Sequence, residues 1–227
     1  MRAALILCLA LAAPSCGRVL TEHEKAFAGA IFADQVDVDR VRFSGPLLAG
    51  SFTYQRPARP RVTCTERLYP PIEAAEITVS PAAMAVFNHV RYREDLWRED
   101  YLEELPEILS LPEAMLFAHE MTHVWQWQNR DRTGYHPLRA AGEHSASPDP
   151  YLFDPETEVS FLSHGYEQQG AIVEEYLCCR VLAPDAARTA RLHAMLSAEF
   201  PVTDLRYRLA DRVRLPWKGA EIEGICD

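Results

Sequence analysis

Two histidines and a glutamate near the middle of the chain have the spacing of a metal-binding helix motif. The segment reads His119-Glu120-x-x-His123. Residues four apart on an α-helix share a face, so both imidazoles can bind one ion, and this pattern is typical of Zn²⁺ sites. Glu120 lies one residue round the helix, where it can act as general base on the water that zinc holds. The motif therefore predicts zinc-dependent hydrolysis.

A catalytic zinc site needs a third protein ligand and one open position. The extended pattern H-E-x-x-H-x-x-G-x-x-H fails, because position 126 is Gln and position 129 is Asn. A later segment carries Glu167 and Glu174, which are seven residues apart and so share a helix face. We expect Glu167 to be the third ligand. Glu174 is the alternative, either as the ligand or as the acceptor for a ligand histidine N–H.

Two helices must bring these groups together. One is expected over residues 112–129, with Pro112 and Glu113 suited to a first turn. Its apolar residues lie away from the two histidines. A second helix is expected over residues 166–182, where Gly170 and Ala171 would let the two helices approach closely. The apolar stripe of the first helix consists of Ala114, Phe117, Ala118, Met121 and Trp125.

Peptide hydrolysis also needs a donor for the developing oxyanion. Spacing does not choose among the candidates, which are His136, His144, His164, Tyr166 and Tyr176.

The remaining chain indicates an α+β, helix-rich fold with a small sheet packed on the active-site helix. Thr21 opens a capping box, and a helix should follow to about residue 33. Residues 36–43 and 77–80 read as strands, and residues 84–90 as either a strand or a helix start. We expect residues 77–80 to be the edge strand beside the cleft, where a substrate adds as a strand. The remaining expectations are a solvated helix face over 91–107, irregular structure over 130–157, and helices over 184–198 and 203–214.

Composition limits the partners and the location. The chain has 227 residues, 48% of them hydrophobic, and a formal net charge of −10. This acidity argues against nucleic-acid binding through bulk electrostatics. Residues 1–15 are typical of a secretory signal, which leaves Cys16 first in the mature chain and residues 16–227 as a single domain. We expect an exported protein that is periplasmic, secreted or lipid-anchored, with membrane contact only through a lipid on Cys16.

Four later cysteines fit an oxidising compartment. We expect Cys64 and Cys226 each to pair with one of Cys178 and Cys179.

The chain resembles a family of small bacterial proteins assigned as zinc metallopeptidases, sometimes labelled Vgr-related. The resemblance implies a zincin-like fold with ligands His119 and His123, base Glu120 and a helix-borne glutamate as third ligand. The chain departs from the family at Gly170 and Glu175, where the family usually reads Ala and Asp. A charged insertion and the signal peptide are further departures. The pieces that carry the resemblance are Leu20-Thr21-x-x-Glu24 with residues 36–41, Ile77-Thr78-Val79, residues 119–126 and residues 167–176.

Three functions stay open from the sequence. The first is an exported zinc-dependent metallopeptidase-like hydrolase that acts on a peptide or protein. The second is a non-hydrolytic zinc-binding module of the cell envelope or of a secretion system. The third is a protein without metal, in which His119 and His123 are surface residues.

Overall fold

A computed structural model describes residues 17–47, 53–202 and 212–227. The predicted signal and Cys16 therefore lie outside the described residues, as does most of the helix predicted over 203–214. The last residues of that segment, Arg212–Arg214, form a strand instead. Among the helices of the described ranges, none has the length and apolar character needed to cross a membrane.

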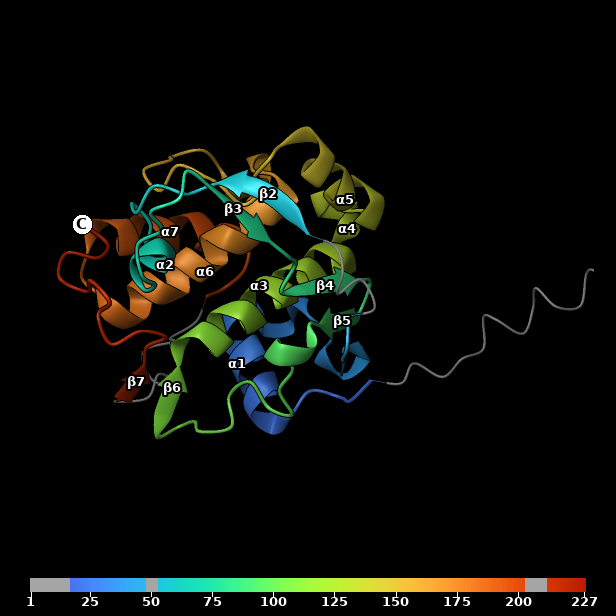
Figure 1. The fold of residues 1–227 in the computed structure, drawn as a ribbon. Coiled ribbons are helices and arrows are strands. Elements are labelled where there is room, and N and C mark those ends of the chain that lie inside the picture. Colours follow the sequence, from blue (N-terminus) through green and yellow to red (C-terminus); the bar gives the residue numbers. More distant parts are fainter. Residues whose placement is uncertain (1–16, 48–52, 203–211) are drawn as a thin grey trace, which may run out of the picture.

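The fold is α+β and rich in helix, as the sequence predicts (Figure 1). The helices are α1 Glu22–Phe32, α2 Cys64–Arg67, α3 Leu111–Gln128, α4 Arg130–Thr133, α5 Pro137–Ala146, α6 Tyr166–Leu182 and α7 Ala187–Ser197. The strands are β1 Arg42–Ser44, β2 Tyr54–Pro57, β3 Glu76–Val79, β4 Ala83–Val86, β5 His89–Tyr92, β6 Ile108–Ser110 and β7 Arg212–Arg214. Short 3-10 turns cover Ala33–Gln35, Val38–Arg40, Glu94–Leu96 and Phe161–Ser163.

Helices α3 and α6 form the centre of the molecule and pack directly against each other (Figure 1). The apolar stripe of α3 is fully buried, with Phe117 and Trp125 among the largest buried side chains. Packing of this stripe against α1 and the surrounding core fixes the rotation of α3 about its axis. The opposite face, which carries His119 and His123, is thereby turned toward α6.

The sheet beside α3 has the strand order β1-β5-β4. Strand β5 pairs parallel to β1 and antiparallel to β4, so β4 is an edge strand, and it packs on α3. Strand β3 belongs elsewhere, because it pairs antiparallel with β2 in a separate two-stranded sheet. The strand predicted over residues 36–43 is also shorter than expected, since a 3-10 turn at Val38–Arg40 precedes β1.

Two further expectations are wrong. Residues 91–107 do not form a solvated helix face, because the chain turns irregularly there and buries Tyr101 and Leu102. The amide of Tyr101 donates to the buried carboxylate of Glu24, which holds this segment against α1. Residues 130–157 are not irregular throughout, because they contain α4 and α5. Helix α5 begins with Pro137, and the His136 side chain accepts the amide of Leu138.

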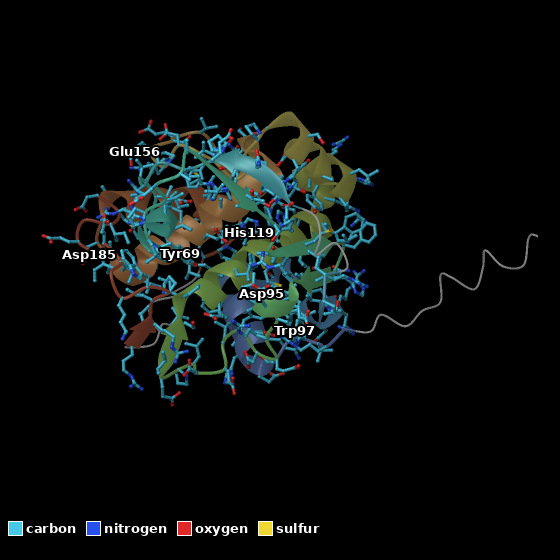
Figure 2. All side chains as sticks on the ribbon, in the orientation of Figure 1. Tyr69, Asp95, Trp97, His119, Glu156 and Asp185 are labelled. Atoms are coloured by element: carbon cyan, nitrogen blue, oxygen red, sulfur yellow. A yellow bond between two sulfur atoms is a disulfide. The ribbon has the colours of Figure 1, made fainter. Side chains whose placement is uncertain are left out.

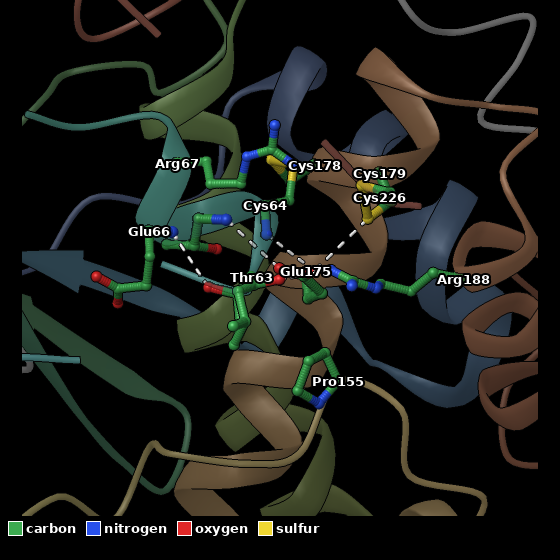
Figure 3. Close-up of polar contacts among 12 residues, drawn as sticks. Thr63, Cys64, Glu66, Arg67, Pro155, Glu175, Cys178, Cys179, Arg188 and Cys226 are labelled. Atoms are coloured by element: carbon green, nitrogen blue, oxygen red, sulfur yellow. Dashed lines mark hydrogen bonds and ion pairs between the residues drawn. A yellow bond between two sulfur atoms is a disulfide. The ribbon is translucent and has the colours of Figure 1, made fainter. Parts of the chain in front are cut away.

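Two disulfides join α6 to α2 and to the C-terminal segment (Figure 3). Cys64 pairs with Cys178 and Cys179 pairs with Cys226, so the predicted pairing is confirmed. They anchor α2 and the C-terminal segment to neighbouring residues of α6. Glu175 is buried beside them, accepting the amide of Cys64 at 2.9 Å and pairing with Arg188 at 3.1 Å.

Candidate metal centre

Three side-chain atoms from α3 and α6 converge on one point in the buried interior. The Nε2 atoms of His119 and His123 are 3.2 Å apart. Glu167 Oε2 lies 3.4 Å from His119 Nε2 and 3.3 Å from His123 Nε2. The three atoms therefore form a nearly equilateral triangle. All three residues are buried, and Figure 2 labels His119 near the middle of the molecule.

The other ring nitrogen of His123 is held by an amide network. His123 Nδ1 lies 2.8 Å from Gln126 Oε1. The Gln126 amide nitrogen donates to Gln169 Oε1 and to the carbonyl of Tyr166, so its orientation is fixed by α6. Because Gln126 Oε1 can only accept, His123 carries its proton on Nδ1. Its Nε2 lone pair is then free to face the corner shared with Glu167.

Glu174 occupies the matching position beside His119. Its Oε1 atom lies 3.4 Å from His119 Nδ1, which is the nitrogen opposite the shared corner. The carboxylate therefore faces the outside of the ring and does not join the triangle. A carboxylate at this place orients a histidine and raises its basicity as a ligand.

Glu167 is positioned by groups from α5. The Glu143 carboxylate accepts the backbone amides of Tyr166 and Glu167 at 2.8 and 3.1 Å, which caps the start of α6. His144 Nε2 lies 3.3 Å from Glu167 Oε1. One carboxylate oxygen of Glu167 thus faces the two motif histidines, while the other faces His144.

Opposite charges and burial act against each other on the pKa values of this centre. Burial alone would lower the pKa of His119, but the carboxylates of Glu174 and Glu167 outweigh burial and raise it well above its ordinary value. Burial alone would raise the pKa of Glu167, but the three neighbouring histidines outweigh burial and hold it well below the usual range. Without a metal, the site therefore favours a protonated His119 on α3 facing an ionised Glu167 on α6.

Glu120 sits beside the triangle and not within it. It is 4% exposed, and its Oε2 atom is buried with no hydrogen-bond partner among the described residues. Burial raises the pKa of Glu120, and the positive charge of the nearby histidines only partly offsets this. Glu120, His123 and Glu167 line a cavity of about 130 Å³ that also borders β4 and α5.

The predicted oxyanion donors lie at different places, and only His144 reaches this cavity. The Tyr166 hydroxyl donates to the carbonyl of Gly134. His136 caps α5, and the ring of Tyr176 lies beside His193. His164 is also absent from the residues that line the cavity in the described structure.

Two tyrosines that the sequence analysis missed line the cavity with Glu120. The Tyr135 ring stacks on His123 with the ring centres 6.2 Å apart. The Tyr151 ring centre lies 5.8 Å from that of His119. Both follow glycine- and proline-rich stretches, so no periodic signal in the sequence pointed to them.

The strand that borders this cavity is β4 and not the predicted segment 77–80. Residues Ala83–Val86 of β4 line the cavity next to Glu120 and His123. Residues 77–80 include most of strand β3, as predicted, but none of them lines this cavity, and β4 borders it instead.

Comparison with known proteins finds similarity to a protein of the type VI secretion system. No family model matches the chain. The type VI secretion system spike protein VgrG2b of Pseudomonas aeruginosa is 26% identical over 190 residues, which cover 82% of this chain. The alignment covers 15% of VgrG2b, so this chain matches a small part of that protein. A solved structure of the effector domain of P. aeruginosa VgrG2b is 27% identical, with a TM-score of 0.48, and the match covers 85% of this chain and 89% of that one.

These comparisons correct the family inferred from the sequence motifs. The similarity is to the VgrG2b effector, which is a different family from the zincin-like metallopeptidases. Membership of the zinc metallopeptidase family is therefore withdrawn.

Proposed function

We propose that the chain is a secretion-associated module that binds Zn²⁺ through His119, His123 and Glu167 and hydrolyses a peptide bond there. The observation that carries this proposal is the triangle of ligand atoms. Tetrahedral zinc ligands at about 2.0–2.1 Å from the ion lie about 3.3–3.4 Å from one another. The three observed separations are 3.2, 3.3 and 3.4 Å.

The chemistry of the donors also fits a cation. Two imidazole nitrogens and a carboxylate that face one another in a buried space need a positive charge among them, which a proton supplies in the metal-free site and a metal ion can supply in its place. Three protein ligands of the His₂Glu type are typical of catalytic zinc, which keeps a position open for water or substrate. The cavity beside Glu120 supplies space for that position.

Bound zinc would supply a Lewis acid that polarises a carbonyl and makes water more acidic. The chain's own part is proton transfer and orientation. Glu120 lines the cavity beside the triangle and its Oε2 atom has no partner among the described residues, so it can take a proton there and later release it to a leaving amine. Tyr135, Tyr151 and His144 line the same cavity and are the available donors for a developing oxyanion.

Strand β4 supplies the backbone along which a substrate can lie. As an edge strand it leaves one row of amides and carbonyls without a strand partner within the described sheet. An extended peptide can add to such an edge and place its carbonyl next to Glu120. The substrate class is therefore proposed as peptide or protein.

A second function is a zinc-binding module that does not hydrolyse. The similarity to VgrG2b favours it, since that protein is a spike protein of a secretion system and carries an effector domain. In this case zinc would stabilise the fold. The chain would be exported through its association with a secretion system. The same three ligands serve both functions, so zinc binding alone does not separate them.

Replacement of the proposed base separates the two functions. We expect Glu120→Gln to keep zinc and to lose at least about 10²-fold in peptide turnover, because proton transfer contributes about that much or more. The measurement is cleavage of a denatured protein substrate, with zinc content determined on the same samples. Wild-type protein that holds zinc and cleaves nothing would favour the non-hydrolytic module. Equal turnover by both proteins would remove Glu120 from the mechanism.

A further inference from the structure

A second cavity lies beside the amino-terminal half of α3. It has a volume of about 240 Å³, and most of its wall is apolar, with Leu96, Met115 and Leu116 among the lining residues. Glu174 is at its edge, and the same carboxylate lies 3.4 Å from His119 Nδ1. The second cavity is therefore next to the proposed metal centre, on the side away from the cavity of Glu120.

The two cavities share their walls. Residues 83–86 line the first cavity, and the neighbouring Ala82 lines the second. Helix α3 contributes Pro112, Glu113, Met115 and Leu116 to the second cavity, and Glu120 and His123 to the first. Because Ala82 directly precedes β4, and β4 packs on α3, the two cavities follow each other along the same strand and helix. A peptide extended along residues 82–86 would pass the metal centre and reach each cavity in turn.

The second cavity has room for a large side chain. A water occupies about 30 Å³ of liquid, so the cavity could hold roughly eight waters, which is more space than a leucine or phenylalanine side chain needs. The charged residues that line the second cavity already have ion-pair partners. Arg98 and Glu113 pair with each other at 3.5 Å, and Glu174 faces His119. A charged side chain would find no free partner of opposite sign among these three residues, and an acidic one would be repelled by Glu174.

We infer that the second cavity is a specificity subsite that takes a large apolar side chain of the peptide substrate. This inference rests on the proposed function, since it assigns the substrate preference of that site. The residues that set the preference are Ala82, Met115 and Leu116, whose side chains bound the space without joining the proposed metal ligands. One methylene more or less in an apolar pocket discriminates by about 10- to 200-fold.

The test measures binding and does not require turnover. Zinc-loaded Glu120→Gln protein is titrated calorimetrically with hexapeptides built on a serine–glycine background. Each peptide carries one Leu, Phe, Ala or Glu, and the varied residue is moved through all six positions. We expect Leu and Phe at one position to bind at least about 10-fold more tightly than Ala, and Glu to bind most weakly.

Two variants assign that preference to the cavity. Ala82→Phe fills the second cavity and should abolish the advantage of Leu and Phe. Ala146→Phe is the matched control, because Ala146 is exposed on α5 and lines neither cavity, and it should leave the preference unchanged. Leu116→Ala removes apolar wall from the second cavity and should reduce the advantage of Leu and Phe over Ala. Unchanged zinc content in every variant shows that the metal centre is intact.

The outcomes separate this inference from the proposed function. Equal binding of Leu, Phe and Ala peptides, or a preference that Ala82→Phe leaves intact, overturns the subsite. A preference that disappears in Ala82→Phe supports it. If wild-type protein shows the same peptide preference but cleaves none of the peptides, the subsite stands and only the hydrolytic function fails.

Discussion

The backbone of Gly170 on α6 lies directly against the imidazole of His119 on α3. A methyl group placed on Gly170 would come within 2.6 Å of His119 Cε1 and 2.8 Å of both ring nitrogens. The position tolerates no side chain unless His119 moves. This close approach is what allows Glu167, one turn earlier on α6, to meet the two histidines.

Gly170→Ala should therefore reduce zinc affinity strongly. Overpacking typically costs about 1–3 kcal/mol, and the gain in helix propensity of up to about 1 kcal/mol offsets only part of it. The matched control is Gly29→Ala on α1, where a Cβ would have no neighbour within 4 Å and the substitution should stabilise the protein. Competition with a chromogenic chelator measures the affinity, and thermal unfolding measures stability. Full zinc affinity in Gly170→Ala would show that the helix contact does not position His119.

The contact between Glu143 and the start of α6 gives a second prediction. Glu143→Ala removes the acceptor of two α6 amides and should cost about 1 kcal/mol of stability. Zinc affinity should also fall, because one of those amides belongs to Glu167. Glu107→Ala, at an exposed position, is the control. Chemical unfolding and chelator competition measure both effects. Loss of stability with unchanged zinc affinity would limit Glu143 to a structural role.

A pH dependence follows from Glu175 beside the disulfides. Burial raises the pKa of Glu175 above 4.5, although the Cys64 amide and Arg188 partly oppose this. The folded state therefore binds the proton more tightly than the unfolded state does. Protonation of Glu175 therefore adds to the free energy of unfolding. This contribution is fully present below pH 4.5 and is lost as the pH rises through the folded-state pKa of Glu175.

Urea unfolding of wild type and Glu175→Gln, with disulfides intact, should show this sign. The stability of wild type relative to the variant should fall as the pH increases from 4 toward neutrality, because Gln does not titrate. A relative stability that rises with pH would mean that the ionised Glu175–Arg188 pair outweighs burial.

Local patterns in the sequence were sufficient for the two central helices. The predicted helix over 166–182 has the bounds of α6, and that over 112–129 differs from α3 by one residue at each end. The helix period also placed Glu167 and Glu174 on the face toward α3. Strand pairing is not local, and for that reason residues 77–80 were assigned to the wrong sheet.

The side chains that surround the metal centre could not be predicted from the sequence, for a different physical reason. Glu143, Tyr135 and Tyr151 all lie in the segment 130–157, where glycines and prolines interrupt any helical period, and His144 of the same segment was one of five candidate donors that spacing did not separate. Their places depend on the docking of α5 against α6, which is a tertiary contact. The sequence therefore indicated which residue types meet on the two long helices, but not which side chains close the cavity over them.

Zinc content is the measurement that tests the central claim most directly. Elemental analysis should be made on residues 16–227, purified without a metal-affinity tag, and on three variants. The account predicts one zinc per wild-type chain, loss of zinc in His123→Ala and Glu167→Ala, and a retained site of about 10- to 100-fold lower affinity in Glu174→Ala. Wild-type protein without zinc, or loss of zinc in Glu174→Ala with retention in Glu167→Ala, would contradict the proposed centre.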